Sequence, residues 1–422
     1  SNLVLYSTHE YKGILFMKTI ILSLVIITNI YATDNVGAYQ WDTFIQKALD
    51  ASFSIKQDDA QLRLEKGKIS QSTLWKNPTL DMAFDDGLDN NIDYTYFEFS
   101  QKLPALGESS SKKRAAEFSL ESAKHSKDST ILQVQYQAAS LFQKIYFLKM
   151  QLGILDQQIA KIKDLQNKSK SREDLGEISN LERSRIDILN HQILMKKQKL
   201  NNQYIQVQFD AQALLNVDEE IVLQGDIVKP SEDKIDAFIA SLEQSPEYLS
   251  NKAKLKATKE ELTLIKTTRY ALPELYLYSE RDYNLNNKVD AVYGFGFRLS
   301  LPLWDRKDSS IEIQNSKIQK STLQAQEVHY KMKRHLTSYH KLYTNASLQL
   351  EEYKKNLLNP SKKYYETTLF SFELGEKSLL ELLDAQALFL QSQLEYQELI
   401  STTHFYWLQL SNAASINLLK DN

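Results

Sequence analysis

The chain has 422 residues, of which 42% are hydrophobic and 25% charged, and its formal net charge is −3. Acidic and basic residues are interspersed, so electrostatics give no indication of a nucleic-acid partner. Cysteine is absent, which excludes disulfides, thiolate metal sites, thiol catalysis and a lipid-bearing cysteine. Glycine and proline are scarce, at 11 and 7 residues, and long stretches without either predict very long helices.

An upstream extension and a secretory signal peptide are expected over residues 1–32. Met17 and Lys18 precede an apolar run from Ile20 to Ile30. A basic residue, a short apolar core and a small residue at its end are typical of such a signal. The alternative is a membrane anchor over residues 13–30, which is barely long enough to span a bilayer. Export of a cysteine-free chain fits a bacterial cell envelope.

The mature chain begins with a helix, a β-hairpin and a long helical hairpin. A periplasmic helical segment is expected over residues 33–78, with its helix from Trp41 to Thr73, and a transmembrane β-hairpin over 79–103. A helical hairpin is expected over 104–216, with one helix from Ser109 to about Lys168 and, after a turn, a second helix that ends at about Asn216. Asn77-Pro78 ends the first helix. A polar turn at residues 85–91 separates the two extended runs of the β-hairpin.

The second half repeats this plan. The expected segments are a linker and helix over residues 217–272, with the helix from Ser231 to Thr268; a second β-hairpin over 273–302; and a second helical hairpin over 303–422, with helices from Asp308 to Leu358 and from Ser378 to about Ile416. Asn359-Pro360 is expected to interrupt the long helix. Pro104 and Pro302, and likewise Gly176 and Gly375, lie 198 and 199 residues apart. A nearly constant offset indicates an internal duplication.

Both long helices carry a seven-residue seam in which every position is apolar or aromatic. The seam residues are Ile131, Val134, Ala138, Leu141, Ile145, Leu148, Leu152, Leu155, Ile159 and Ile162 in the first helix, and Met332, Leu336, Tyr339, Tyr343, Ala346, Leu350, Tyr353 and Leu357 in the second. This period predicts coiled-coil packing with a left-handed supercoil. A helix of about 55 residues forms a rod on the order of 80 Å long.

The extended runs alternate between apolar and polar residues. The residues on the apolar side, which we expect to face lipid, are Leu80, Met82, Phe84, Phe97, Phe99, Leu275, Leu277, Tyr293, Phe295, Phe297 and Leu299. Polar, charged and glycine residues lie on the other side, together with Tyr276 and Tyr278. Alternation over about ten residues suits a tilted strand with lipid outside and water inside.

A soluble sheet with one solvated face is the alternative. Four strands cannot close a barrel, and open strand edges are not tolerated in lipid. We therefore expect three chains to pool twelve strands and twelve helical rods. The predicted fold class is a mostly α, mixed α+β membrane protein, in which long coiled-coil helices form an α-barrel and two β-hairpins per chain contribute to a trimeric 12-stranded β-barrel.

The mature chain resembles the TolC-like outer membrane factors of Gram-negative bacteria. The most specific stretch runs from Tyr365 to Ala387 and contains Leu374-Gly375-Glu376-Lys377-Ser378; Asn77-Pro78-Thr79-Leu80 and Ser100-Gln101-Lys102-Leu103-Pro104 match in type and order. The resemblance implies a homotrimeric barrel in outer membrane lipid and a helical tunnel across the periplasm. It also implies docking onto a periplasmic adaptor (a membrane fusion protein) and an inner-membrane pump of the RND type. The Asn-Pro entry and a basic turn at 112–114 look most like the heavy-metal and cation efflux branch.

Two helix-to-helix turns are the candidate contacts for an adaptor. These tips contain Leu175, Gly176 and Glu177 in the first half and Leu374, Gly375 and Glu376 in the second. The resemblance assigns the exposed tips to adaptor contact. The plain structural interpretation is turn geometry, because glycine permits a positive φ, and the two interpretations are compatible.

Charged residues next to the tips are the candidate periplasmic gate. Glu381 and Asp384 are three residues apart and so share a helical face. In a trimer they would form rings of like charge, which favour cations and can hold an aperture shut. Glu182 and Arg185 are their first-half equivalents, and Arg185 could pair with Asp384 or Glu381. The alternative is a solvent-facing pair of no consequence.

Catalysis is not expected, and neither is a cofactor or a metal site. His329, His335 and His340 share a helix without the spacing that places two ligands on one face; the last two are expected on a tunnel wall or surface. The predicted function is a passive exit duct, and the resemblance implies metal cations or small toxic compounds as its substrates. The alternatives are a periplasmic coiled-coil adaptor or scaffold and the exit duct of a type I protein secretion system.

Overall fold

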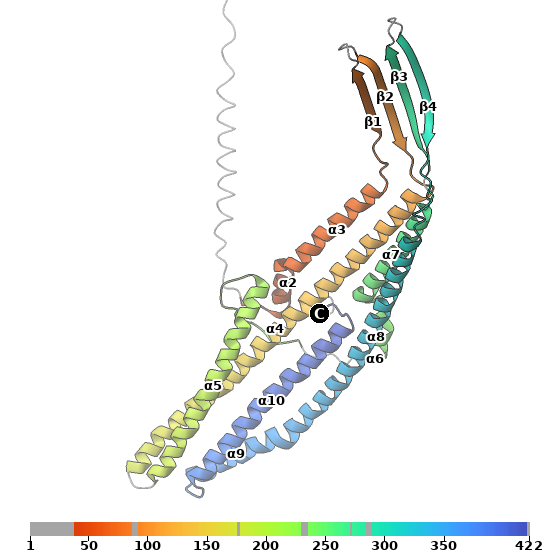
Figure 1. Ribbon diagram of the computed structural model, residues 1–422. Coiled ribbons are helices and arrows are strands. Elements are labelled where there is room, and N and C mark those ends of the chain that lie inside the picture. The colour runs from red at the N-terminus through yellow and green to blue at the C-terminus, as the bar shows by residue number, and fades with distance from the viewer. Residues whose placement is uncertain are drawn as a thin grey trace, which may run out of the picture.

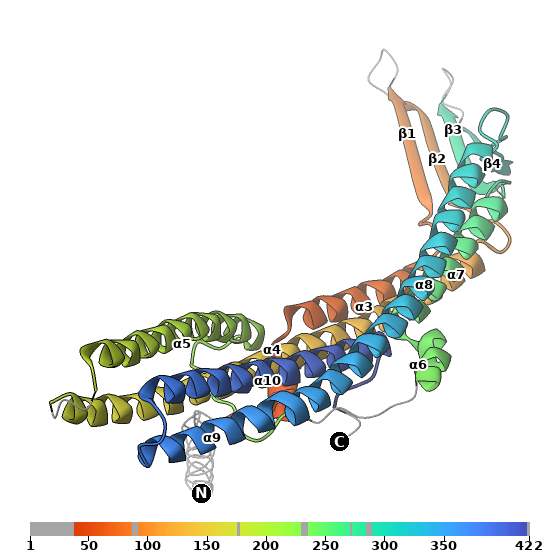
Figure 2. The same cartoon turned by 90° about the horizontal axis from the view of Figure 1, so that it is seen from below.

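The computed structural model describes residues 38–86, 92–174, 178–228, 235–270, 272–283 and 289–419. The expected signal peptide therefore lies outside the described residues. Figure 1 shows an elongated molecule in which the strands stand together at one end and the long helices run toward the other. In the perpendicular view of Figure 2, the molecule bends where the strands meet the helices. Long helices and a small sheet are the predicted ingredients, and the predicted fold class is confirmed at this level.

The sheet contains both hairpins side by side. Its strands are β1 (Thr79–Asp86), β2 (Ile92–Lys102), β3 (Glu274–Tyr283) and β4 (Val289–Arg298). They pair antiparallel in the order β1-β2-β3-β4. The two halves of the chain are therefore joined by the pairing of β2 with β3, where Phe99 lies opposite Leu277. Among the described residues, β1 and β4 have no strand on their outer sides.

The helix expected from Trp41 to Thr73 is in fact two helices, α2 (Trp41–Ala51) and α3 (Phe53–Ser72). Ser52 leaves the helical conformation, and its side chain accepts a hydrogen bond from the backbone N–H of Ile55. Serine is favoured at such a position because its oxygen satisfies an otherwise unpaired N–H of the first turn. The amphipathic pattern predicted helix correctly but did not locate this break.

The equivalent helix of the second half is broken in the same way. The expected helix from Ser231 to Thr268 is divided into α6 (Ile235–Ser241), a 3₁₀ turn (Leu242–Gln244) and α7 (Pro246–Thr267). Ser245 caps α7 by accepting from the N–H of Tyr248, and Pro246 occupies its first turn. Proline suits that place because its missing N–H would have no helical partner there.

Two helical hairpins extend away from the sheet. The first is formed by α4 (Glu108–Asp174) and α5 (Asn180–Leu215). The second is formed by α8 (Asp308–Tyr353), α9 (Asn359–Glu373) and α10 (Leu379–Ala413). With 67 residues, α4 is about 100 Å long. Within the chain, α5 packs on α4, α4 on α10, and α10 on both α8 and α9.

The expected interruption at Asn359-Pro360 takes the form of a π-helical segment, Lys354–Leu358. The α-helix α8 ends at Tyr353 and α9 begins at Asn359, while the chain stays helical throughout. The N–H of Asn359 bonds to the carbonyl of Lys354, five residues earlier. This wider turn accommodates Pro360, which can neither donate a bond nor fit a regular helix interior. One extra residue in the turn shifts the seam. Leu357 is consequently exposed, contrary to the predicted seam, and Leu358 packs against the buried cluster around Tyr365.

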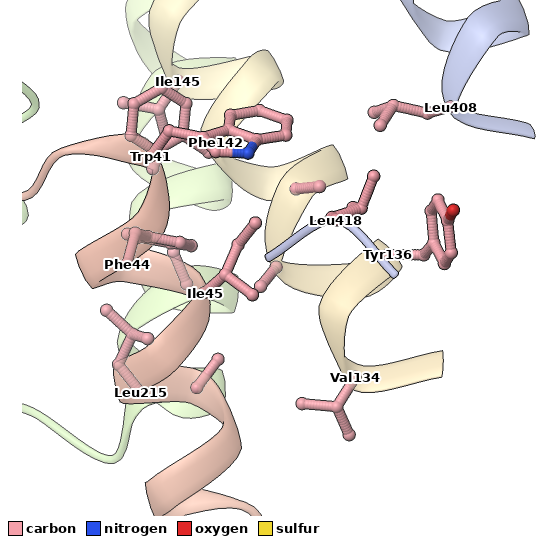
Figure 3. Close-up of a cluster of buried hydrophobic side chains, with 14 of the residues drawn as sticks. Trp41, Phe44, Ile45, Val134, Tyr136, Phe142, Ile145, Leu215, Leu408 and Leu418 are labelled. Carbon is pink, nitrogen blue, oxygen red and sulfur yellow. The ribbon is translucent and has the colours of Figure 1, made fainter. Parts of the chain in front are cut away.

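The largest core lies midway along the rod. Figure 3 shows Trp41, Phe44 and Ile45 of α2 facing Phe142 and Ile145 of α4. The rings of Trp41 and Phe44 meet that of Phe142 edge to face, with centroids 5.4 and 5.6 Å apart. A second cluster, with Leu155 and Ile162 among its members, follows the seam between α4, α5 and α10. All ten seam residues of α4 are buried or half-buried, as coiled-coil packing requires.

Candidate channel surfaces

One face of the sheet, here called the apolar face, is covered with exposed apolar side chains. The register places Leu80 opposite Phe99, Phe99 opposite Leu277, and Leu277 opposite Phe295. Paired residues project to the same side of a sheet. The predicted lipid-facing residues of the strands are therefore brought onto one face, and Leu299 follows just after β4. All of them are exposed within the chain, Phe295 by 86%. Whether this face touches lipid stays a prediction.

The opposite face, here called the tyrosine face, carries Tyr96, Tyr276 and Tyr278. Tyr276 lies opposite Gly296, and Tyr278 lies opposite Gly294. A Cβ atom on either glycine would overlap the ring of the tyrosine opposite it. Each ring therefore lies over a position that only glycine can leave open. The sequence contains the signal for this arrangement, Tyr-x-Tyr in one strand and Gly-x-Gly in the next, but alternation alone does not show that the two motifs are in register.

An ion-pair network lies on the same face, near the helical end of the strands. The guanidinium of Arg298 donates to the Oε1 atom of Glu98 at 2.9 Å and lies 3.6 Å from Glu274. The hydroxyl of Tyr96 donates to the other oxygen of Glu98 at 2.5 Å. Glu98 is almost completely buried, so its charge requires these partners. Sequence reasoning missed this network because its members come from three strands.

The second tip has the geometry that its glycine predicts. Gly375 follows the end of α9 with φ +78°. Its N–H bonds to the carbonyl of Phe372 at 3.0 Å, and the N–H of Glu376 bonds to that of Ser371 at 2.9 Å. This pair of bonds is the Schellman arrangement that ends many helices. Leu374 is exposed beside Gly375. The first tip, Leu175, Gly176 and Glu177, lies outside the described residues.

The two gate glutamates occupy equivalent positions at helix starts. Glu182 accepts from the backbone N–H of Ser179 at 2.9 Å, and the hydroxyl of Ser179 accepts from the N–H of Glu182. Glu381 and Ser378 repeat this reciprocal pair before α10. Each glutamate thus completes a capping box, a role that the sequence analysis did not assign. The gate role itself stays a prediction.

Glu381 is also held by a cation. The ammonium of Lys377 donates to Glu381 at 2.5 Å. This bond, and to a lesser extent the hydrogen bonds from Ser378, lowers the pKa of Glu381 to about 2. Asp384 and Arg185 are exposed. The ion pairs of the described residues do not join Arg185 to Glu381 or Asp384 within one chain.

The histidines do not gather into a metal site. Among the described residues, no group of three or more potential metal ligands from His, Asp and Glu lies close enough to hold an ion. His335 is exposed and His340 half-buried. His404 was not singled out by the sequence; its ring is buried between Phe147 and Trp407, and burial lowers its pKa to about 4. It is therefore a neutral core side chain at pH 7.

No helix in the described part of the chain is long and apolar enough to cross a membrane.

No protein-family model matches the chain, and no curated protein matches its sequence. Solved structures of outer membrane channels are nevertheless similar. The CmeC outer membrane channel of Campylobacter jejuni has a TM-score of 0.73 at 12% identity, over 90% of this chain and 87% of that one. CusC has a TM-score of 0.74 at 13% identity, over 90% and 93% of the two chains.

A third similar structure is the open state of the MtrE outer membrane channel of Neisseria gonorrhoeae. Its TM-score is 0.72 at 11% identity, over 90% of both chains. At these identities the likeness concerns the arrangement of helices and strands, and it extends over nearly the whole described chain. The chain therefore has the fold of these outer membrane channels.

Proposed function

We propose that three copies of this chain form a passive outer membrane channel, which conducts substrate from a periplasmic adaptor and an inner-membrane pump to the exterior. The observation that carries this proposal is the sheet. It has an exposed apolar face, a polar tyrosine face and, among the described residues, no strand on the outer side of β1 or β4. In lipid, strand edges have to be paired. Pooling strands between copies pairs the edges, places the apolar face toward lipid and encloses water behind the tyrosine face.

The helical hairpins also have exposed apolar residues on two opposite sides, where a neighbouring helix could pack. On α5, Leu181, Ile188, Met195 and Phe209 are exposed and fall on one seven-residue spacing, in which only Asn202 is polar. Both views show α5 and α9 on opposite sides of α10. Exposed apolar residues also mark that other side, among them Leu348 and Phe370. A heptad seam needs a partner helix, and the α8–α9 edge of the next protomer would supply one while closing the ring.

The pump and substrate are proposed on narrower grounds. The tips at Gly176 and Gly375 would contact the adaptor, and rings of Glu381 and Asp384 would form the periplasmic gate. The Asn-Pro entry to the first hairpin favours an RND-type pump and metal cations or small toxic compounds as substrates. An exit duct for type I protein secretion is the alternative within the same fold. Growth of a deletion strain in the presence of metal salts or antibiotics distinguishes small-molecule export from protein secretion.

The central test is assembly. We expect the protein to require detergent for extraction from outer membranes, to cross-link as a trimer and to form pores in planar bilayers. The double variant Ile188→Lys, Met195→Lys should lose the trimer, because it places charge in the seam. Asn201→Lys, also exposed on α5 but outside the seam, should keep it. A monomer released in the soluble periplasmic fraction would overturn the channel and favour a coiled-coil scaffold.

A further inference from the structure

The tyrosine face has a fixed aromatic surface, here called the tyrosine wall, made of Tyr96, Tyr276 and Tyr278. Because a Cβ on Gly294 or Gly296 would overlap these rings, Tyr278 and Tyr276 lie across β4 instead of standing away from the sheet. Tyrosine covering a strand glycine in this way protects the glycine backbone and pins the register. The rings therefore cover their neighbouring strand with a flat aromatic layer.

Neighbouring groups hold the wall in place. The ring of Tyr96 stacks on that of Tyr278, with centroids 6.2 Å apart and an interplanar angle of 27°. The centroids of Tyr276 and Tyr278 are also 6.2 Å apart. The guanidinium of Arg298 lies 5.2 Å from the centroid of Tyr276, and Glu98 fixes both Arg298 and Tyr96. Tyrosines of β2 and β3 are thus tied to a glycine strand, β4, by one network.

Charge on the two faces is unequal. Asp81, Asp85 and Glu280 share the tyrosine face by register. In contrast, the strand residues of the apolar face whose side chains are described include no acid. On the tyrosine face, Arg298 is already paired with Glu98 and Glu274, and Lys102 lies at the helical end of β2. The wall is therefore bordered by carboxylates that Arg298 does not neutralise.

We propose that the tyrosine wall is a selectivity surface of the β-domain, favouring organic cations with flat apolar groups over anions of similar size. This inference rests on the proposed function, because only the pooled barrel turns the tyrosine face toward the lumen. Aromatic rings attract cations through their negative faces. Carboxylates along the same lumen raise the local concentration of cations. A planar, positively charged compound would be attracted both by the ring faces and by the carboxylates.

The glycines set the bore beside the wall. A methyl group at position 294 or 296 forces the ring above it off the sheet, and in a barrel the only direction left is inward. Gly294→Ala and Gly296→Ala are therefore expected to lower single-channel conductance. Ala291→Val, on the apolar face of the same strand, is the matched control and should leave conductance unchanged.

The direct test uses two aromatic probes of opposite charge in planar bilayers, benzyltrimethylammonium and benzenesulfonate. The wild-type pore is expected to be blocked by the cation at lower concentration than by the anion. Replacing Tyr276 and Tyr278 by Leu should weaken the cation block about threefold to fivefold and leave the anion block unchanged. Tyr276→Phe and Tyr278→Phe keep the rings and should keep the block. Tyr293→Leu, which removes a tyrosine from the apolar face, is the control for loss of an aromatic residue.

The outcomes distinguish failure of the selectivity surface from failure of the proposed channel function. Wild-type protein that forms no pore overturns the proposed channel. A pore with equal block by both probes, or with a cation block that the leucine variants leave intact, overturns the selectivity surface alone. Should the leucine variants fail to insert, the glycine variants decide, and unchanged conductance in both contradicts the placement of the wall.

Discussion

The hydroxyl of Tyr353 donates to the Oε2 atom of Glu395 at 2.6 Å, at the residue where α8 passes into its π-helical segment. The bond crosses from α8 to α10 and secures the helix just before the widened turn. Burial, and to a lesser extent the hydrogen bond to Glu395, raises the pKa of Tyr353. The hydrogen bond from Tyr353, followed by that from Gln391, lowers the pKa of Glu395.

Tyr353→Phe should lower the Tm by about 2 °C, since a hydrogen bond to a charged group contributes about 1 kcal/mol or more. The lowered pKa of Glu395 means that its share of this stability is present above its ordinary pKa of 4.5 and is lost as the pH falls through the folded-state value. Thermal unfolding between pH 8 and pH 3 therefore checks the sign. The difference between wild type and variant should shrink on acidification. Tyr364→Phe, at an exposed site on α9, should show no difference at any pH.

The gate prediction now needs a variant that separates charge from helix capping. Replacing Glu381 and Asp384 by Ala should raise single-channel conductance or reduce cation preference, because the rings lose their charge. Ser378→Ala removes the capping partner of Glu381 but no charge, and should cost about 1 kcal/mol of helix stability. Conductance that responds equally to both changes would assign the effect to the start of α10 and not to a ring of charge.

Acidification offers an independent check on Glu381. Its pKa of about 2 keeps the carboxylate ionised at any pH above about 3. The contribution of its capping bonds is correspondingly present at neutral pH and lost only as the pH falls through about 2. Conductance changes between pH 7 and pH 4 should therefore be the same in wild type and in Glu381→Gln. A titration abolished by Glu381→Gln would contradict this assignment.

The stability of the second tip should depend on the backbone conformation of Gly375. Gly375 adopts φ +78° with no atom within 4 Å of a Cβ placed on it, so a substitution is strained by its backbone and not by crowding. Gly375→Ala should cost about 1 kcal/mol. Gly375→Asn should cost less, because asparagine tolerates the left-handed region better. Thermal unfolding of the three proteins measures this order, and equal stability of all three would exclude the turn as the reason for glycine.

The apolar face gives the most direct test of membrane insertion. Phe295→Arg should sharply reduce the amount of trimer recovered from outer membranes, because an arginine facing lipid at mid-depth costs about 2–4 kcal/mol. Ala83→Arg, on the tyrosine face, should be recovered normally, since that side would face water. Equal recovery of both variants would indicate that neither face meets lipid.

The two periodicities of the sequence determined most of the architecture. Heptad spacing in residues such as Val134 and Ile162 requires helix partners, and alternation around Phe295 and Gly296 requires a two-faced strand, whatever the rest of the chain does. Both patterns are local, because they depend only on how a helix or strand repeats its side chains. The positions and faces of the strands were predictable for that reason, and so was the turn at Gly375.

Tertiary structure decided what depends on neighbours distant in the chain. The break at Ser52 and the π-helical segment before Pro360 are features that the amphipathic period does not locate, and the π-helical segment moves the seam from Leu357 to Leu358. The seating of Tyr276 on Gly296 depends on the register of β3 with β4, and the burial of Glu98 depends on Arg298, 200 residues away. Periodicity shows which face a residue is on, but only the packed chain shows what lies opposite it.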